Sequence, residues 1–290
     1  MNRLVLIDGN AILHRAFHAL PPLTAPDGSV VNAVYGFVSI LIKIFNDLRP
    51  THMAVAFDRP EKTFRKELFK DYQAKRPEMD SDLVTQIPKV QDVVRAFGIP
   101  MYDKAGFEAD DVIGTLAKQF ASLVIPATAP GSREKKDWIP GQARNDKQWE
   151  IIIVTGDKDI LQLVDDKKGV KVFMPTKGLS EGKLYGEAEV VEKMGVPPKQ
   201  IPDLKALMGD ASDNYPGVAG IGLKTATKLL SEYATVEKLI KAKKVGDDAR
   251  LGLVLATIHT DVPVEIKPIE PLETLDTPEA QRKLEEFHFP

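Results

Sequence analysis

Acidic side chains recur in this sequence at places where a metal ion could bind between them. Three of them follow short apolar runs, and the others stand in dense groups along the chain. The nine carboxylates are those of Asp8, Asp58, Glu108, Asp110, Asp111, Asp157, Asp159, Asp210 and Asp213. A single acid after a strand is most often a helix cap or a turn residue. Three acids that follow apolar runs in the same way are harder to explain by capping.

Carboxylates gathered in this number cannot all stay ionised without cations, because like charges and burial both raise their pKa values. The chain has no cysteine, and its five histidines show no metal-ligand spacing, so any metal must be bound by oxygen. Oxygen ligands favour Mg²⁺ or Mn²⁺, and this many ligands suit two or more ions about 4 Å apart, as in phosphodiester hydrolysis. One ion would activate water and the other would stabilise the leaving 3′ oxygen. Calcium buffering is the alternative, but no EF-hand spacing is present.

The elements that must position these acids are predicted to form an α/β fold. Apolar runs at residues 4–7, 53–57 and 151–156 are each followed by an acid. Such runs are typical of strands that are buried on both faces of a parallel sheet flanked by helices. Because the carboxyl ends of parallel strands meet at one edge, where α/β folds place their sites, we expect these acids to converge. Further elements are predicted as helices within residues 34–45 and 112–120 and a strand at residues 170–174.

The chain is predicted to contain two structural units, as its length of 290 residues suggests. Beyond about residue 195 the sequence changes to short helical pieces broken by glycine and proline, so we divide it into residues 1–175 (α/β) and 176–290 (helical, with a C-terminal tail). Residues 124–147 have no apolar period and are dense in proline, glycine and charge, which predicts a disordered loop that is either an insertion, which we favour, or a functional lid. The insertion joins a helix to the start of a strand, so we expect it to point away from the site.

The charge balance does not identify a partner. The net charge of −3 argues at first against nucleic acid, but setting the nine acids aside leaves a surplus of basic residues. No stretch approaches the roughly 18 apolar residues of a membrane span, and no targeting segment is visible. We therefore expect a cytoplasmic monomer without a membrane partner.

Five sequence motifs follow one another in an order that is typical of one family. They are LIDGNAILHRAFHALPPL, VAFDRPEKTFRKEL, GFEADDVIGTLA, IVTGDKDILQLV and ALMGDASDNYPGVAGIGLKTA. Together they resemble the 5′ nucleases, which include the 5′→3′ exonuclease domain of bacterial DNA polymerase I and the flap endonucleases. The resemblance implies a PIN-like fold with a mostly parallel sheet, a helical arch at about residues 59–90 and a C-terminal helix-hairpin-helix. It also implies hydrolysis of DNA at 5′ flaps and at nicked or branched duplexes in primer removal and repair. RNA primers and a separate DNA polymerase are further partners that it suggests.

The resemblance also assigns roles to individual residues. It places the first metal site on Asp8, Asp58, Glu108 and Asp110 and the second on Asp157, Asp159, Asp210 and Asp213, with Asp111 between the two sites. It places Tyr72, Lys75 and Arg76 of the arch near the reacting phosphate. Gln73 stands where the family carries a lysine, which puts the rate in doubt, and we expect Gln73→Lys to raise cleavage about tenfold. On a helix, Arg76 would lie on roughly the same face as Gln73, and Lys75 nearly opposite.

The basic and aromatic stretch from Arg59 to Arg76 has two interpretations. As a solvated helix it would bury Phe64, Leu68 and Tyr72, which are spaced by four residues. Near bound metals, its basic residues would contact a scissile phosphate, and its aromatic rings would stack on unpaired bases. Both interpretations can hold for different faces of the segment.

A glycine-rich turn follows the last acids. The residues expected to bind duplex DNA are Gly217, Gly220, Gly222, Lys224, Thr225 and Lys228. Glycines let the backbone approach a phosphate closely, and the next helix adds N–H groups and charge. Alone, such a hairpin would more often be only a turn, but its place just after the acids favours duplex binding without sequence specificity. In the family, the hairpin carbonyls also bind a monovalent cation, here K⁺.

Three alternative functions remain to be compared with a 5′ nuclease. A DNA-binding relative with weakened catalysis is suggested by Gln73, and a flap-cleavage assay separates it from an active enzyme. A phosphatase with an aspartate nucleophile fits less well, because the segment Asp8-Gly9-Asn10 lacks the second acid two residues on. A dinucleotide-dependent dehydrogenase would need a glycine fingerprint after the first strand, which is missing. Residues 241–255 also look shorter than in typical relatives, which bears on the downstream DNA contacts.

Overall fold

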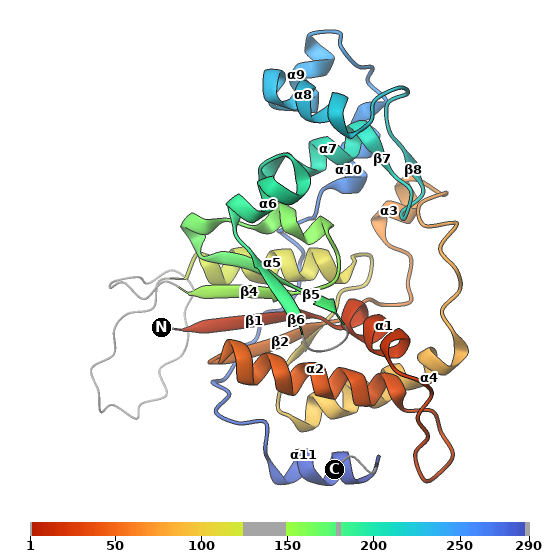
Figure 1. Cartoon of the computed structure of the whole chain (residues 1–290), viewed down its shortest axis with the longest axis vertical. Coiled ribbons are helices and arrows are strands. Elements are labelled where there is room, and N and C mark those ends of the chain that lie inside the picture. Colours follow the sequence, from red (N-terminus) through yellow and green to blue (C-terminus); the bar gives the residue numbers. More distant parts are fainter. Residues whose placement is uncertain (1, 124–148, 178–180, 288–290) are drawn as a thin grey trace, which may run out of the picture.

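A six-stranded sheet forms the centre of the molecule, in the strand order β3-β2-β1-β4-β5-β6 (Figure 1). The computed structural model describes residues 2–123, 149–177 and 181–287. The strands are β1 (Arg3–Asp8), β2 (His52–Ala56), β3 (Met101–Tyr102), β4 (Glu150–Val154), β5 (Val170–Lys177) and β6 (Glu181–Tyr185). Neighbouring strands are parallel except for β5 and β6, which are antiparallel.

Helices cover both faces of the sheet (Figure 1). One face carries α1 (Gly9–Ala19), α2 (Asn32–Leu48), α4 (Ser81–Ala96) and α11 (Pro278–Glu285). The other face carries α5 (Ala109–Ala121) and α6 (Glu187–Met194). Beyond them lies the helical unit of α7 (Ile201–Met208), α8 (Leu223–Tyr233), α9 (Val236–Lys241) and α10 (Ala249–Ala256), which extends away from the sheet (Figure 1). Shorter elements are α3 (Phe64–Leu68), the 3₁₀ turns η1 (Asp159–Leu163), η2 (Asp166–Lys168) and η3 (Pro198–Gln200), and the hairpin β7 (Gly209–Asp210) and β8 (Tyr215–Pro216).

The central strand β1 shows why its sequence is apolar at consecutive positions. Leu4 and Leu6 belong to the core that contains α5, whereas Val5 and Ile7 belong to the core that contains α1 and α2. All four side chains are at most 1% exposed. Full burial of such a side chain is worth about 1.5–3 kcal/mol, so the two hydrophobic cores hold the strand from both sides.

The predicted α/β fold is confirmed by this architecture, and the four predicted strands coincide with β1, β2, β4 and β5. The strands β3 and β6 were not predicted, because β3 has two residues and β6 is exposed along most of its length. The predicted unit boundary after residue 175 falls inside β5, and β6 completes the same sheet. The predicted insertion at residues 124–147 lies outside the described residues. None of the described helices is long and apolar enough to span a membrane.

The predicted arch differs from the structure in its conformation. Within residues 59–90 the helical segments are α3 and the start of α4, and residues 70–76 form turns. The helical stripe expected for Phe64, Leu68 and Tyr72 is therefore wrong: Tyr72 is 3% exposed, but Leu68 is 52% exposed because α3 ends there. Gln73 has a left-handed backbone with φ of 56°, which interrupts any helix at this point.

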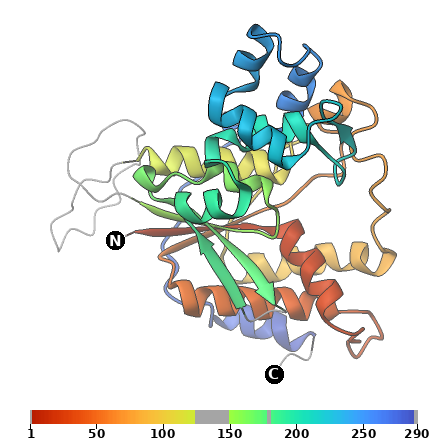
Figure 2. The ribbon, with the colours of Figure 1, turned by 45° about the horizontal axis from the view of Figure 1, so that its top comes forward.

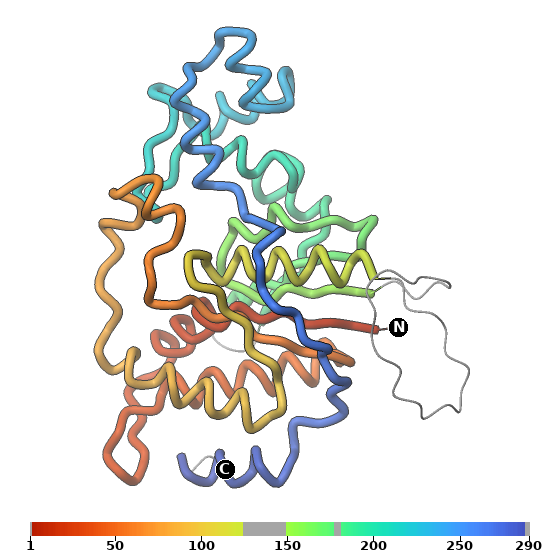
Figure 3. Tube along the Cα trace, turned by 180° about the vertical axis from the view of Figure 1, so that it is seen from behind, coloured from red at the N-terminus to blue at the C-terminus, as the bar shows by residue number. Residues whose placement is uncertain are grey.

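The C-terminal segment returns from the helical unit to the α/β unit. It runs behind the sheet as an extended chain, seen in blue in Figure 3. The Val262 amide donates to the Thr115 hydroxyl over 3.0 Å, and the Leu272 amide donates to the Thr51 carbonyl over 2.9 Å. The segment then ends in α11, which packs against α4. Figure 2 shows the β7–β8 hairpin of the helical unit reaching towards α3.

Candidate metal centre

Three acids meet at the carboxyl edge of the sheet, as the sequence predicts for neighbouring parallel strands. Asp8 is the last residue of β1, and Asp58 and Asp157 follow β2 and β4, which flank β1. One Asp8 oxygen accepts a 2.9 Å hydrogen bond from the Ala11 amide, and the other accepts a 2.7 Å bond from the Thr155 hydroxyl. The first bond caps α1, so the same carboxylate ends the strand and starts the helix.

The first turn of α5 adds further carboxylates to this edge. Asp58 connects the two elements, because its Oδ1 accepts a 2.7 Å hydrogen bond from the Ala109 amide of α5. Asp110, one residue on, is close enough to Asp157 and Asp8 for their charges to act on it. The end of the sheet and the start of α5 therefore bring acids together that are about 50 residues apart in sequence.

Burial and mutual repulsion raise the pKa values of the acids in this first group. Burial, with smaller contributions from the charges of Asp58 and Asp157, raises the pKa of Asp8 to about 7. The pKa of Asp110 is raised well above its ordinary value by burial and then by Asp157 and Asp8. Burial likewise raises the pKa of Glu108 to about 7, against the attraction of a nearby arginine. A bound divalent cation would relieve this repulsion.

A second group of carboxylates lies beside the first. One oxygen of each of Asp159, Asp210 and Asp213 lies within 4.8 Å of the others, and in the described part of the chain this is the only group of three or more possible ligands that meets so closely. Asp159 begins η1, and the other two lie on the β7–β8 hairpin. Burial and the neighbouring Asp157 raise the pKa of Asp159 to about 6. This donor set of carboxylate oxygens fits Mg²⁺ or Mn²⁺.

Asp111, which is predicted to lie between the two metal sites, is bound by hydrogen bonds in this structure. Its side chain is fully buried, and each of its oxygens already accepts two hydrogen bonds. Oδ1 accepts from Arg65 and from the His259 amide, both at 2.8 Å. Oδ2 accepts from Arg65 at 2.7 Å and from the Glu108 amide at 3.1 Å. These four hydrogen bonds hold the Asp111 carboxylate in place at the start of α5.

Arg65 is the partner that occupies Asp111. Its side chain is 3% exposed, and all five of its N–H groups donate hydrogen bonds. The acceptors are Asp111, Glu108 and the carbonyls of Leu255 and Thr257, at 2.7–3.0 Å. One guanidinium therefore joins α3, the first turn of α5 and the chain that leaves α10. We infer that it holds Glu108 in place beside the first group.

The predicted arch residues lie next to the second group, on turns. The Tyr72 hydroxyl lies 3.3 Å from both Glu108 and Asp213, and the Gln73 side-chain amide donates to Asp213 over 3.1 Å. Arg76 lies 3.8 Å from the same Asp213 and is 58% exposed. Lys75 is exposed on the neighbouring turn position. Arg76 therefore lies beside the second group from a turn and not from a helix, and its contact with a scissile phosphate stays a prediction.

The predicted DNA-binding residues lie on the surface of the helical unit. Gly217 packs so closely on the end of α7 that an added Cβ would lie 2.2 Å from the Met208 carbonyl carbon. Gly220 has a φ of 78°, which favours glycine. Gly222 then precedes α8, whose first turns expose the side chains of Lys224, Thr225 and Lys228. The glycine turn therefore presents the N-terminus of α8 to solvent.

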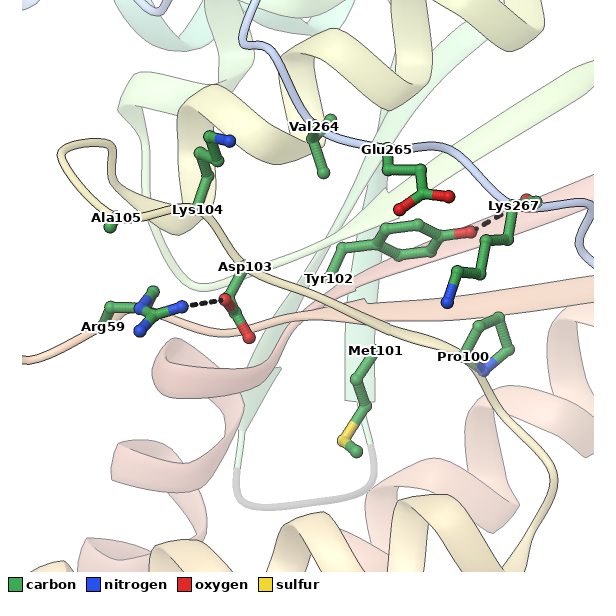
Figure 4. A pocket seen from close by; sticks show the side chains of 10 residues that line it. All are labelled: Arg59, Pro100, Met101, Tyr102, Asp103, Lys104, Ala105, Val264, Glu265 and Lys267. Carbon is green, nitrogen blue, oxygen red and sulfur yellow. Dashed lines mark hydrogen bonds and ion pairs between the residues drawn. The ribbon is translucent and has the colours of Figure 1, made fainter.

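A pocket of about 440 Å³ lies apart from these carboxylates, between β3 and the returning C-terminal segment (Figure 4). Arg59 and Asp103 form a 3.1 Å ion pair on one side of it. On the other side the Tyr102 hydroxyl donates to the Lys267 carbonyl over 3.1 Å. None of the nine predicted carboxylates lines this pocket, so the candidate chemistry lies at the strand ends.

Two residues of the site were missed by sequence reasoning. Arg65 was counted only as one of the basic residues of the arch, and nothing in its spacing shows that it is buried. Lys205, on α7, lies 2.6 Å from Asp159 and also donates to Asp210. Its position five residues before Asp210 is the only signal in the sequence, and it is a weak one.

The raised pKa values predict that the metal-free protein becomes more stable as the pH falls. An acid whose pKa is raised by folding binds a proton more readily in the folded state, so its destabilising charge is lost below the folded pKa. For Asp8 the window runs from about 7 down towards its ordinary value of 3.8. We expect the melting temperature in EDTA to rise by several degrees between about pH 8 and pH 5.5. Mg²⁺ should remove most of this difference, and a flat profile in EDTA would contradict the assignment.

Comparison with solved structures places this arrangement in the class of 5′ nuclease folds. The flap endonuclease of bacteriophage T5, in a pseudo-enzyme-product complex with DNA and metal ions, superimposes with a TM-score of 0.66 at 19% identity, covering 99% of this chain and 100% of that chain. Flap endonuclease-1 from Methanococcus jannaschii gives a TM-score of 0.53 at 17% identity, covering 98% and 91%. The predicted 5′ nuclease fold is thereby confirmed.

Sequence comparison gives the family. Two family models match in order: the N-terminal resolvase-like domain of 5′-3′ exonuclease at residues 3–128 and its C-terminal SAM fold at residues 196–282. DNA polymerase I of Bacillus subtilis (strain 168) is 41% identical over 277 residues, which cover 91% of this chain and 28% of the polymerase. The chain belongs to the 5′-3′ exonuclease family. It spans less than a third of the length of the polymerases that it matches.

Proposed function

We propose that this chain is a structure-specific 5′ nuclease that hydrolyses DNA phosphodiesters with divalent metal ions. The observation that carries the proposal is the convergence of two carboxylate groups at the carboxyl edge of the sheet. The solved relatives that share the fold include a complex with DNA and metal ions, which supports the same substrate here. The proposed cofactor is Mg²⁺ or Mn²⁺.

The residues of each group have distinct proposed roles. Asp8, Asp58 and Asp110, with Glu108 beside them, would bind one ion, and Asp159, Asp210 and Asp213 the other, with Asp157 between the groups. When bound, the ions supply an activated water and stabilise the charge on the leaving 3′ oxygen. The protein holds the ligands rigidly, because Asp8 caps α1 and Asp58 accepts from the first residue of α5. Such rigidity places the attacking and leaving atoms without reorganisation.

The helical unit is proposed to bind the duplex part of the substrate. The glycine turn and the N-terminus of α8 can approach a phosphate closely, and Lys224 and Lys228 add positive charge. These contacts are to the DNA backbone, so they select duplex geometry and carry no sequence information. A K⁺ ion bound by the turn carbonyls would strengthen the same contact.

The biological role is proposed from the relatives. Because the matching region is a part of DNA polymerase I, we propose roles in primer removal and DNA repair, with a DNA polymerase as the partner and RNA primers among the substrates. We propose a monomer, because one chain contains both carboxylate groups and the duplex-binding turn.

The proposal is tested by incubating the chain with a labelled 5′-flap duplex and Mg²⁺. We expect cleavage at the base of the flap, none with EDTA, and much slower cleavage of a matched 3′ flap. Equal cleavage of the two flaps would contradict structure-specific 5′ nuclease activity. Binding without cleavage would support the alternative of a DNA-binding relative with weakened catalysis.

Arg76→Ala should slow single-turnover flap cleavage by about 10–100-fold. The Arg76 guanidinium is exposed and lies close to Asp213, so it can contact the scissile phosphate while the phosphate gains charge. Arg76→Lys keeps the charge and should recover part of the rate, although it loses the bidentate geometry. Equal rates for Arg76→Ala and the wild type, at saturating enzyme and Mg²⁺, would remove Arg76 from the proposed machinery.

A further inference from the structure

Lys205 places its ammonium group among the carboxylates of the second group. Its Nζ lies 2.6 Å from Asp159 Oδ1 and also donates a hydrogen bond to Asp210 Oδ2. The side chain is 21% exposed, so the contact is largely shielded from water. Two of the three aspartates that are close enough to share a metal ion are therefore bridged by a cation of the protein itself.

Asp210 has only one oxygen to offer to a further cation. Its Oδ1 accepts hydrogen bonds from the Ser212 amide at 2.8 Å, from the Ser212 hydroxyl and from the Asp213 amide at 3.4 Å. These bonds fold the turn between β7 and β8. Its Oδ2 accepts from Lys205. A divalent ion that binds Asp210 at a coordination distance of about 2.1 Å must use Oδ2, so it competes with the ammonium for the same oxygen.

The first group of carboxylates has no lysine inside it in the described part of the chain. Within residues 2–123, 149–177 and 181–287, none of the ion pairs of the structure involves Asp8, Asp58, Asp110 or Asp157. The two groups are similar in ligand chemistry, but only the second carries a lysine inside it. A divalent ion would therefore meet Asp8, Asp58 and Asp110 without an ion-pair partner among the described residues, beside a Glu108 that is paired with Arg65, and a second group in which Lys205 pairs with two of the three acids.

We propose that Lys205 is the built-in counter-ion of the second group, and that a divalent ion binds there only by displacing the Lys205 ammonium. The proposal rests on the proposed metal-dependent function, whose second ion it concerns. Before metal binds, the ammonium offsets part of the negative charge of Asp159 and Asp210. The exchange makes the second ion the weaker one, since its binding includes the cost of removing an existing ion pair.

The test is a titration of the whole chain with Mn²⁺ in the absence of DNA, with free Mn²⁺ measured by electron paramagnetic resonance. We expect two classes of site in the wild type. Lys205→Gln should tighten the weaker class by about tenfold or more, because a positive charge within a few ångströms has been removed, and should leave the tighter class unchanged. Lys205→Arg, which keeps the charge, should stay near the wild type.

Two further variants make the result decisive. Lys205→Met also removes the charge but keeps the apolar stem of the side chain. It provides the same comparison if Lys205→Gln does not fold. Adding Asp159→Asn to Lys205→Gln should abolish the gain, which places it in the second group. An unchanged or weaker second class in both neutral variants, or a single class in every protein, would overturn the proposal. Because no DNA is present, this outcome is distinct from a failure of flap cleavage by the wild type.

Discussion

Asp110→Asn should lower single-turnover cleavage of a 5′ flap by about 1,000-fold, the upper range of losses when one group that stabilises the transition state is removed. Asp110 lies in the first turn of α5 with Asp157, Asp8 and Asp58 acting on its charge, so it is at the centre of the first group. The amide is nearly isosteric but a poor ligand for a hard divalent cation. Flap affinity should stay within about tenfold, because the duplex is bound by the helical unit.

The same variant should be more stable than the wild type in EDTA. Burial and neighbouring acids raise the pKa of Asp110 far above its ordinary value, so its charge opposes folding when no cation is bound. A variant that loses activity but gains stability without metal identifies a metal ligand, because the loss of a structural residue would lower stability. The matched control is Asp103→Asn: Asp103 follows β3 at the same edge of the sheet but pairs with Arg59 at the surface. If Asp110→Asn lost stability, or Asp103→Asn lost as much activity, the assignment of the first group would be wrong.

Arg65→Gln should lower the free energy of unfolding by about 3–5 kcal/mol, the usual loss when one partner of a buried ion pair is removed. The Asp111 carboxylate, which has no exposed surface, would lose two of its four hydrogen bonds and its only ion-pair partner in the described residues. The carbonyls of Leu255 and Thr257 would lose their donors as well. Urea unfolding at constant pH measures the change.

The contribution of charge can be separated from that of packing. Arg65→Gln combined with Asp111→Asn removes both charges, so part of the stability should return, although the carbonyls stay unpaired. Arg59→Gln is the control, because Arg59 also pairs with two acids but is 43% exposed. It should lower stability far less than Arg65→Gln does, because water screens an exposed ion pair. Similar losses for Arg59→Gln and Arg65→Gln would show that burial of the Arg65 network does not determine its strength.

The positions of the metal-site acids could be predicted because they follow from strand order. Apolar runs that end in an acid determine both the strands and the edge where Asp8, Asp58 and Asp157 meet. The roles of Asp111 and Arg65 could not be predicted in this way. A carboxylate that accepts four hydrogen bonds and one that faces a metal look alike in sequence, and their partners at residues 255–259 are distant in the chain.

The conformation of the arch also could not be predicted from the sequence pattern. Its apolar spacing favours one long helix, but α3 ends at Leu68. The residues that follow form turns, and the backbone of these turns is hydrogen-bonded to the helical unit. The Gln73 backbone N–H donates to the Asp213 backbone carbonyl over 2.8 Å, and the Asn214 side chain donates to the Asp71 backbone carbonyl over 2.7 Å. These tertiary contacts outweigh local helix propensity, which is a weak preference. The left-handed Gln73 follows from the same contacts.

The location of bound Mn²⁺ tests the central claim most directly, because the account rests on the strand-end carboxylates as the metal ligands. Anomalous scattering from crystals of the chain with a 5′-flap duplex and excess Mn²⁺ would locate the ions. The account predicts one peak within about 2.2 Å of oxygens of Asp8, Asp58 or Asp110 and a second among Asp159, Asp210 and Asp213. In the second site the Lys205 ammonium should have moved away from Asp210. Ordered DNA at the strand ends with no Mn²⁺ peak on these carboxylates would contradict the account.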